Sequence, residues 1–140
     1  VAETAVELAK YHHVDPTKAY VAAMMHDVCK EMDKAKMKRC MEICFPALMS
    51  YAEPVWHGWL GFRKLKEMGI YDDEILSAVY HHVLGDGRKV LDKIIYIADK
   101  SNPKRHHDIT EEIELAKIDL DASMILIQEN YRKRKAAADE

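Results

Sequence analysis

The sequence predicts an all-α fold, and three observations support this. Gly and Pro are scarce, with 5 and 4 among 140 residues, whereas the good helix formers Lys, Arg, Glu and Leu are abundant. Apolar residues recur at spacings of three and four, as in "VAETAVELAKY". Helix-start signals such as Asp15-Pro16 precede such segments. We therefore expect one domain over residues 1–140, a bundle of about six to seven helices.

The first half of the chain predicts three helices. The opening segment carries an apolar stripe from Val1 to Ala9 but begins without a cap or Met, so we expect the first part of this helix to lie upstream of Val1. Asp15 as N-cap and Pro16 at the first helical position predict a second helix to about Met32. A third pattern runs over residues 34–43, and "FPALMSYAEP" then reads as a connection.

The second half predicts further helices separated by clear breaks. A helix from Val55 to Met68 ends at Gly69, which suits the residue after a helix. The acidic "DDE" at 72–74 begins the next helix, which runs to about Val83 and is broken by "GDG". The apolar "KVLDKIIYIADK" forms a helix that Pro103 ends, and after a polar loop the chain is helical from about Thr110.

Charge and composition exclude several classes of function. The net charge is −3 and the pI about 6.3, so the chain lacks the broad basic field that non-specific nucleic-acid binding requires. No apolar run approaches the roughly 18–20 residues of a membrane span, and nothing at the start resembles a signal peptide. The three cysteines are an odd number and favour reduced thiols. We expect a cytoplasmic protein without a membrane or nucleic-acid partner.

Four places break an apolar stripe with groups that bind metals. His26 and Asp27 follow "AAMM", and His57 opens "WHGWLGF". His82 shares the inward face of its helix, and Asp99 closes "IIYIAD". Burying a carboxylate without a partner costs several kcal/mol or more, and a metal ion would be such a partner. Each residue alone is more often structural, but together these five predict a site for Fe, Mn, Mg, Zn or Ni rather than a thiolate metal.

At these residues the sequence resembles a known family. The segments "HDVCK", "WHG", "AVYHHVLG" and "LDKIIYIADKSNPKR" occur in the order and spacing of the HD-domain metal-dependent phosphohydrolases. Within that superfamily the chain is most similar to the YqeK-type symmetrical bis(5′-nucleosyl)-tetraphosphatases, which cut diadenosine tetraphosphate into two ADP. The resemblance runs from Val1 to about Asp121. It implies a single HD domain whose helices surround a metal site.

The resemblance also implies roles for particular residues. His26, Asp27, His57, His82 and Asp99 match the ligands of a dinuclear centre, iron in this family, with Asp27 bridging. Asp27 and Lys30 are then the expected catalytic residues. Lys30 and Arg105 are expected to bind the phosphates of the substrate, with solvent exposure as an equal alternative for Arg105.

Three departures from the family pattern concern the site. The family's first histidine ligand falls about four residues before Val1, Val83-Leu84-Gly85 replaces Thr-Thr-Gly, and Asn102-Pro103 replaces Glu-Pro. These changes leave two alternatives open: an HD phosphohydrolase for another nucleotide, and a non-catalytic nucleotide sensor. The sequence leaves the oligomeric state open, a homodimer included.

Overall fold

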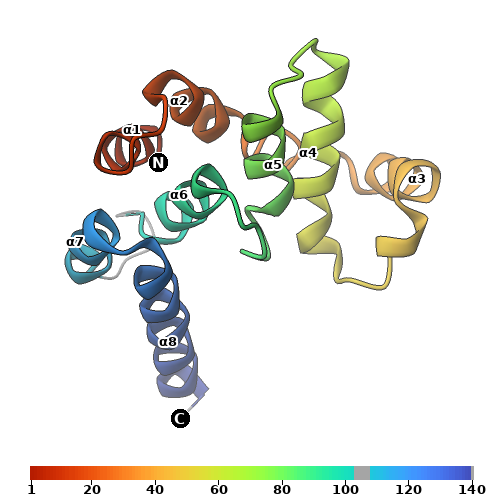
Figure 1. Ribbon diagram of the computed structural model, residues 1–140. Coiled ribbons are helices and arrows are strands. Elements are labelled where there is room, and N and C mark those ends of the chain that lie inside the picture. Colours follow the sequence, from red (N-terminus) through yellow and green to blue (C-terminus); the bar gives the residue numbers. More distant parts are fainter. Residues whose placement is uncertain (103–107, 140) are drawn as a thin grey trace.

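The protein is built from helices throughout its described residues, as the sequence predicts. The computed structural model describes residues 1–102 and 108–139 (Figure 1). Two short 3₁₀ helices, η1 (Pro46–Leu48) and η2 (Glu53–Val55), join α3 to α4. The α-helices are α1 (Ala2–Tyr11), α2 (Pro16–Met25), α3 (Lys34–Cys44), α4 (Trp56–Glu67), α5 (Asp73–His81), α6 (Val90–Lys100), α7 (Thr110–Ile118) and α8 (Leu120–Asp139). No described helix is long and apolar enough to cross a membrane.

Aspartate side chains cap the N-termini of several of these helices, α2, α3 and α5 among them. Asp15, Asp33 and Asp72 each accept a hydrogen bond from a backbone N–H of the first helical turn. Such caps satisfy N–H groups that have no partner within the helix. At the end of α4, Gly69 has φ +87°, the left-handed conformation that favours glycine.

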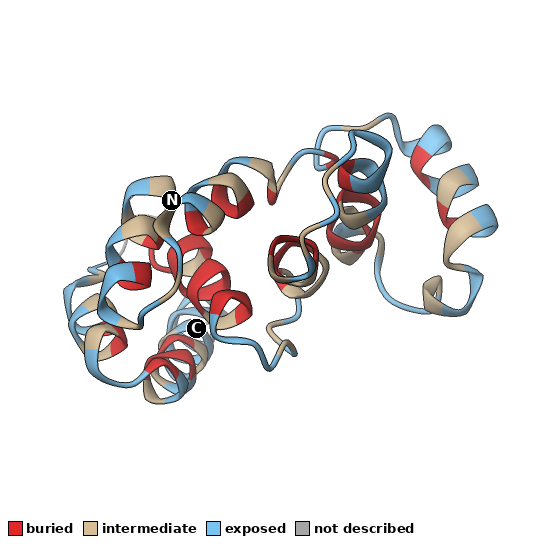
Figure 2. Cartoon of the chain, turned by 45° about the horizontal axis from the view of Figure 1, so that its top comes forward, coloured by how far each residue is buried: buried red, intermediate tan, exposed pale blue. Residues whose placement is uncertain are grey.

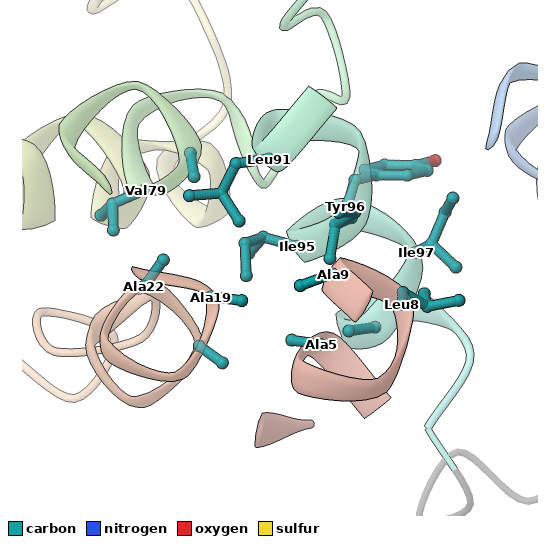
Figure 3. Packing of buried hydrophobic residues seen from close by; sticks show 14 of the residues in the cluster. Ala5, Leu8, Ala9, Ala19, Ala22, Val79, Leu91, Ile95, Tyr96 and Ile97 are labelled. Carbon is teal, nitrogen blue, oxygen red and sulfur yellow. The ribbon is translucent and has the colours of Figure 1, made fainter. Parts of the chain in front are cut away.

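Helix α6 is the centre of the larger hydrophobic core. It packs against α1, α2, α5 and α8, and Figure 3 shows its residues Leu91, Ile95 and Ile97 among alanines of α1 and α2. Small residues on α1 and α2 allow these helices to approach α6 closely. All the apolar side chains of α6 except that of Val90 are buried, together with Asp92 and Asp99.

A second, smaller core lies beside α3 and α4. Trp56, Trp59 and Leu60 of α4 pack there against Met37 and Met41 of α3. Figure 2 shows buried residues on the inner sides of both groups of helices. The two groups of helices meet at the ends of α2, α5 and α6 and the start of α4. The candidate site lies at this place.

The structure differs from the sequence prediction at two helix ends. The second helix ends at Met25, not near Met32, and residues 26–31 form turns with hydrogen bonds such as Lys30 N–H to Asp27 O. The predicted last helix is two helices, because Asp119 is extended between α7 and α8 and its side chain accepts from Ala122 N–H. Both differences arise because local hydrogen bonds replace a continued helix.

Candidate metal centre

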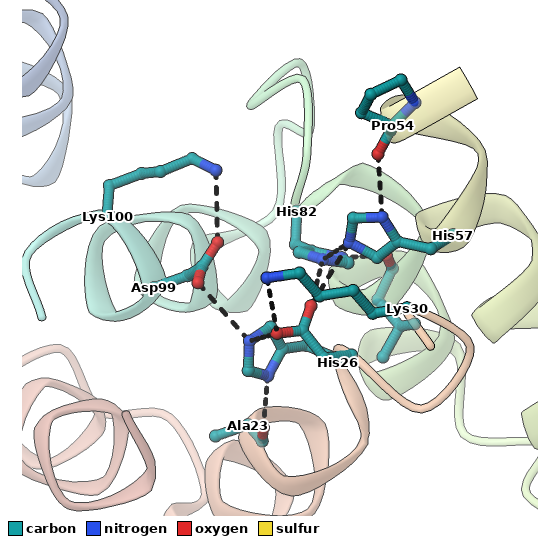
Figure 4. Close-up of polar contacts among 10 residues, drawn as sticks. Ala23, His26, Lys30, Pro54, His57, His82, Asp99 and Lys100 are labelled. Carbon is teal, nitrogen blue, oxygen red and sulfur yellow. Dashed lines mark hydrogen bonds and ion pairs between the residues drawn. The ribbon is translucent and has the colours of Figure 1, made fainter. Parts of the chain in front are cut away.

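The structure brings the five predicted ligands together from four places in the chain. His26 caps the end of α2 and Asp27 follows it, His57 is the second residue of α4, His82 caps the end of α5, and Asp99 is the penultimate residue of α6. Figure 4 shows the side chains of His26, His57, His82 and Asp99 converging. His26, His82 and Asp99 are buried, and Asp27 and His57 are half-buried.

All three imidazoles are held in the same tautomer. Each donates its Nδ1–H to a backbone carbonyl three residues earlier in the chain, an acceptor that cannot itself donate. The pairs are His26 with Ala23 O at 2.5 Å, His57 with Pro54 O at 2.8 Å and His82 with Val79 O at 2.7 Å. With Nδ1–H used in this way, the Nε2 lone pair of each ring points toward the centre, which is the arrangement of metal-binding histidines.

The inward nitrogens face each other and two carboxylates. The Nε2 atoms of His57 and His82 lie 3.2 Å apart, and Asp27 Oδ1 lies 3.3 Å from the first and 3.4 Å from the second. His26 Nε2 lies 3.2 Å from Asp27 Oδ2 and 3.5 Å from Asp99 Oδ1, yet it is buried and makes no hydrogen bond within the described chain. Lone pairs directed at one another in this way are stable only when a cation lies among them.

These atoms form two groups that fit metal ions. Asp27, His57 and His82 make one group and His26, Asp27 and Asp99 the other, with the ligand atoms of each within 4.8 Å of one another. The two groups share Asp27, whose two carboxylate oxygens face different sides. Imidazole nitrogens with carboxylate oxygens suit divalent first-row metals. The donors of each group therefore fit a divalent metal ion.

The pKa values of the clustered side chains also indicate that the site favours a positive charge. Burial alone lowers the pKa of His26, but the carboxylates of Asp27 and Asp99 outweigh it and raise that pKa to about 9. Burial alone raises the pKa of Asp27, but the surrounding His26, His57 and His82 hold it well below its usual range. Without a metal the cluster therefore keeps a proton as its positive charge, and a metal ion would displace that proton.

An open pocket of about 370 Å³ lies over the cluster. Its lining includes Asp27, His57 and Asp99 together with Lys30, predicted from the sequence, whose Nζ lies 3.9 Å from Asp27 Oδ2. Lys100 also lines the pocket, with its Nζ 3.2 Å from Asp99 Oδ2.

Sequence reasoning missed Lys100 and chose Arg105. The position of Lys100, directly after Asp99 at the end of an apolar helix, was the signal that could have identified it. Arg105, the other predicted phosphate-binding residue, lies outside the described residues.

Comparison with known proteins identifies the family of the chain. The family model of the HD domain matches residues 1–103. The chain belongs to the HD domain family. This confirms the family resemblance seen in the motifs, and the all-helical fold of the described residues agrees with it.

Relatives of this HD domain include named enzymes. The chain is 35% identical over 130 residues to a protein of Bacillus subtilis, and 33% identical over 130 residues to one of Halalkalibacterium halodurans. Both are named "Bis(5′-nucleosyl)-tetraphosphatase, symmetrical", and each match covers 89% of this chain and 70% of the relative. A Staphylococcus aureus protein of the same name is 35% identical over 75% of this chain and 56% of its own length.

A solved structure has the same fold. It is a crystal structure from Clostridium acetobutylicum of a protein described as a predicted HD superfamily hydrolase involved in NAD metabolism. The TM-score is 0.77 at 30% identity, and the match covers 99% of this chain and 76% of that one.

Proposed function

We propose that this HD-domain protein is a metal-dependent hydrolase of dinucleoside tetraphosphates, and that it cleaves diadenosine tetraphosphate symmetrically into two ADP. The observation that carries the proposal is the pair of ligand groups sharing Asp27 on the wall of an open pocket. The names of the relatives from Bacillus subtilis and Halalkalibacterium halodurans supply the substrate class.

The proposed centre is dinuclear, with Asp27 as the bridging ligand. His57 and His82 would bind one ion, and His26 and Asp99 the other, as the two ligand groups suggest. Iron is the metal we predict, with Mn, Mg, Zn or Ni as alternatives. When bound, such ions polarise phosphoryl oxygens and lower the pKa of water toward neutrality. We assign residues 1–140 to a single domain, as expected from the sequence.

The chain's own residues would bind and orient the tetraphosphate. The substrate is strongly anionic, so the ammonium groups of Lys30 and Lys100 at the pocket would hold its phosphates and offset charge that develops at the bridging oxygen. Arg105 is a further proposed phosphate ligand. Water adds to one inner phosphorus, the bond from that phosphorus to the central bridging oxygen breaks, and the leaving diphosphate takes up a proton. One water is consumed and two nucleoside diphosphates are formed.

The test is incubation with diadenosine tetraphosphate and chromatography of the products, with metal content measured on the same sample. We expect ADP as the sole nucleotide product and its loss in His57→Ala. The matched control is His81→Ala, because His81 is the neighbour of a proposed ligand but lies in neither ligand group. AMP with ATP as products would indicate a different cleavage. Tight nucleotide binding without any product would favour the sensor alternative.

A homodimer, one of the oligomeric states that the sequence leaves open, is a separate proposal. Met24 and Met68 are among the exposed large apolar residues, at 57% and 49% exposure. Light scattering on the protein as it elutes from a sizing column would give its mass, and a monomer at micromolar concentration would contradict this proposal.

A further inference from the structure

A second groove lies next to the metal pocket, between α6 and α8. It has a volume of about 440 Å³, and its lining includes Tyr96 and Lys100 of α6 with Tyr131, Arg132 and Arg134 of α8. Among the described lining residues the charges are all positive, although the chain as a whole has a net charge of −3. A basic groove with aromatic rings suits a ligand that carries phosphates and a planar base.

Lys100 connects this groove with the metal pocket. It lines both, and its Nζ lies 3.2 Å from Asp99 Oδ2 on one side and 5.5 Å from the centre of the Tyr96 ring on the other. Figure 4 shows the Lys100 side chain extending from α6 above Asp99. A phosphate chain bound at Lys100 would therefore be in reach of both the metal pocket and the groove.

The size of the metal pocket supports a second binding site. Its 370 Å³ lies near the lower end of the roughly 300–1,000 Å³ that ligand pockets span. A dinucleoside tetraphosphate has two bases, two riboses and four phosphates, so a pocket of that size accommodates one half of it. The other half needs a neighbouring site of similar size, and the groove at Lys100 has that size.

Resting on the proposed function, we propose that the groove between α6 and α8 binds the second nucleoside diphosphate half of the substrate. Lys100 contacts the phosphate chain where it passes between the two sites. Arg132 and Arg134 bind the distal phosphates, and the exposed ring of Tyr131 stacks on the base. This arrangement centres the bridging oxygen beside Lys100 and the metal ligands, and so explains why cleavage would be symmetrical.

The experiment counts bound ADP by equilibrium dialysis of the metal-loaded chain. We expect two ADP per chain in the unmodified protein and one in the double variant Tyr131→Ala/Arg132→Ala. For the single variants we expect the weaker ADP to lose on the order of tenfold in affinity, because stacking and charge-assisted contacts each contribute that much. Tyr131→Phe keeps the ring and should restore binding.

The control variant is Lys133→Ala on the same helix. Lys133 is exposed, is not among the groove's lining residues, and points away from Tyr131 because successive helical residues turn by about 100°. It removes the same charge as Arg132→Ala but should leave two ADP bound. All three positions are at the exposed surface of α8, and circular dichroism would verify that each variant is folded.

The outcomes separate this inference from the proposed function. One ADP per chain in the unmodified protein, or two in the double variant, would overturn the second site whatever the catalytic activity. Failure to form ADP from diadenosine tetraphosphate would instead overturn the proposed function and leave the dialysis result readable. When both hold, Tyr131→Ala should raise the KM for diadenosine tetraphosphate about tenfold and change kcat much less.

Discussion

Two buried carboxylates on α6 have opposite surroundings. Asp92 and Asp99 lie seven residues apart on one side of the helix and are 3% and 7% exposed. Asp92 Oδ2 accepts hydrogen bonds from Ser77 Oγ at 3.0 Å and Lys89 N–H at 3.1 Å, although its Oδ1 accepts none from the described residues. Asp99 Oδ1 instead lies 3.5 Å from His26 Nε2, and its Oδ2 accepts from Lys100 Nζ at 3.2 Å.

The adjacent histidines at the end of α5, His81 and His82, show the same contrast in their surroundings. His81 Nδ1 donates to Ser77 O at 2.9 Å and lies 3.9 Å from Asp92, whereas His82 directs Nε2 at Asp27. The lesson is that burial alone does not identify a metal-binding carboxylate. Asp92 is held by hydrogen-bond donors of the fold itself, whereas Asp99, which accepts from Lys100 Nζ, also faces a ring nitrogen that belongs to the same group of candidate metal ligands.

Among substitutions of the candidate metal ligands, Asp27→Asn should cause the largest loss of metal affinity and activity. Asp27 belongs to both ligand groups, so its loss should weaken the binding of metal at both. Removing groups that merely support a metal ligand costs about 10–100-fold in affinity or activity, and we expect more than about 100-fold here. Elemental analysis and the rate of ADP formation measure this, and retention of both metals would contradict the shared role.

Asp99→Asn should have the next largest effect. It disrupts the group of His26, Asp27 and Asp99 but leaves the other group intact, so we expect about half of the parent's metal content. Asp92→Asn is the matched control, being equally buried on the same helix, and should retain all of it. Equal metal loss in the two variants would show that the distinction between the carboxylates is wrong.

Metal affinity should also depend on pH. The pKa of about 9 at His26 means that the metal-free site holds a proton below pH 9, and a metal must displace it. The apparent dissociation constant should therefore rise by up to about tenfold for each unit of pH below 9. Titration with Mn²⁺ from pH 6.5 to 9 tests this, and a flat profile would contradict it.

Without metal, the same proton links pH to stability. The folded-state pKa of His26, about 9, lies above its ordinary value of 6.5. The stabilisation is therefore complete below pH 6.5 and is lost as the pH rises through 9. Urea unfolding of the metal-free protein should show this decline, and His26→Gln should remove it.

The smallest effect is expected for Ser77→Ala, which changes a hydrogen bond of the fold and no candidate metal ligand. It removes one hydrogen bond to the Asp92 carboxylate, which should lower the free energy of unfolding by about 1–2 kcal/mol. Metal content and ADP formation should stay at the parent's level. A loss of metal in this variant would show that the hydrogen bonds around Asp92 and the candidate metal ligands are not independent of each other.

Much of the fold followed from the sequence because helix periodicity and caps act locally. Asp15 and Asp72 begin helices as predicted, and the breaks of the apolar stripe at His82 and Asp99 pointed to residues that lie together. Asp92 carried the same signal as Asp99, and only the three-dimensional positions of Ser77 and Lys89 distinguish them. The turn at residues 26–31 was missed because "HDVCKE" contains no Gly or Pro that would mark the end of the helix carrying "AYVAAMM".

The carbonyl acceptors of the three imidazoles have a consequence for mutational robustness. Ala23, Pro54 and Val79 orient the rings through backbone oxygens, and every amino acid provides that oxygen. Replacing these side chains therefore leaves the protonation pattern of the rings unchanged as long as the local backbone persists. Side chains around the pocket can therefore change without altering which nitrogen of each imidazole carries the proton. Only a change of the backbone at the helix ends would break these hydrogen bonds.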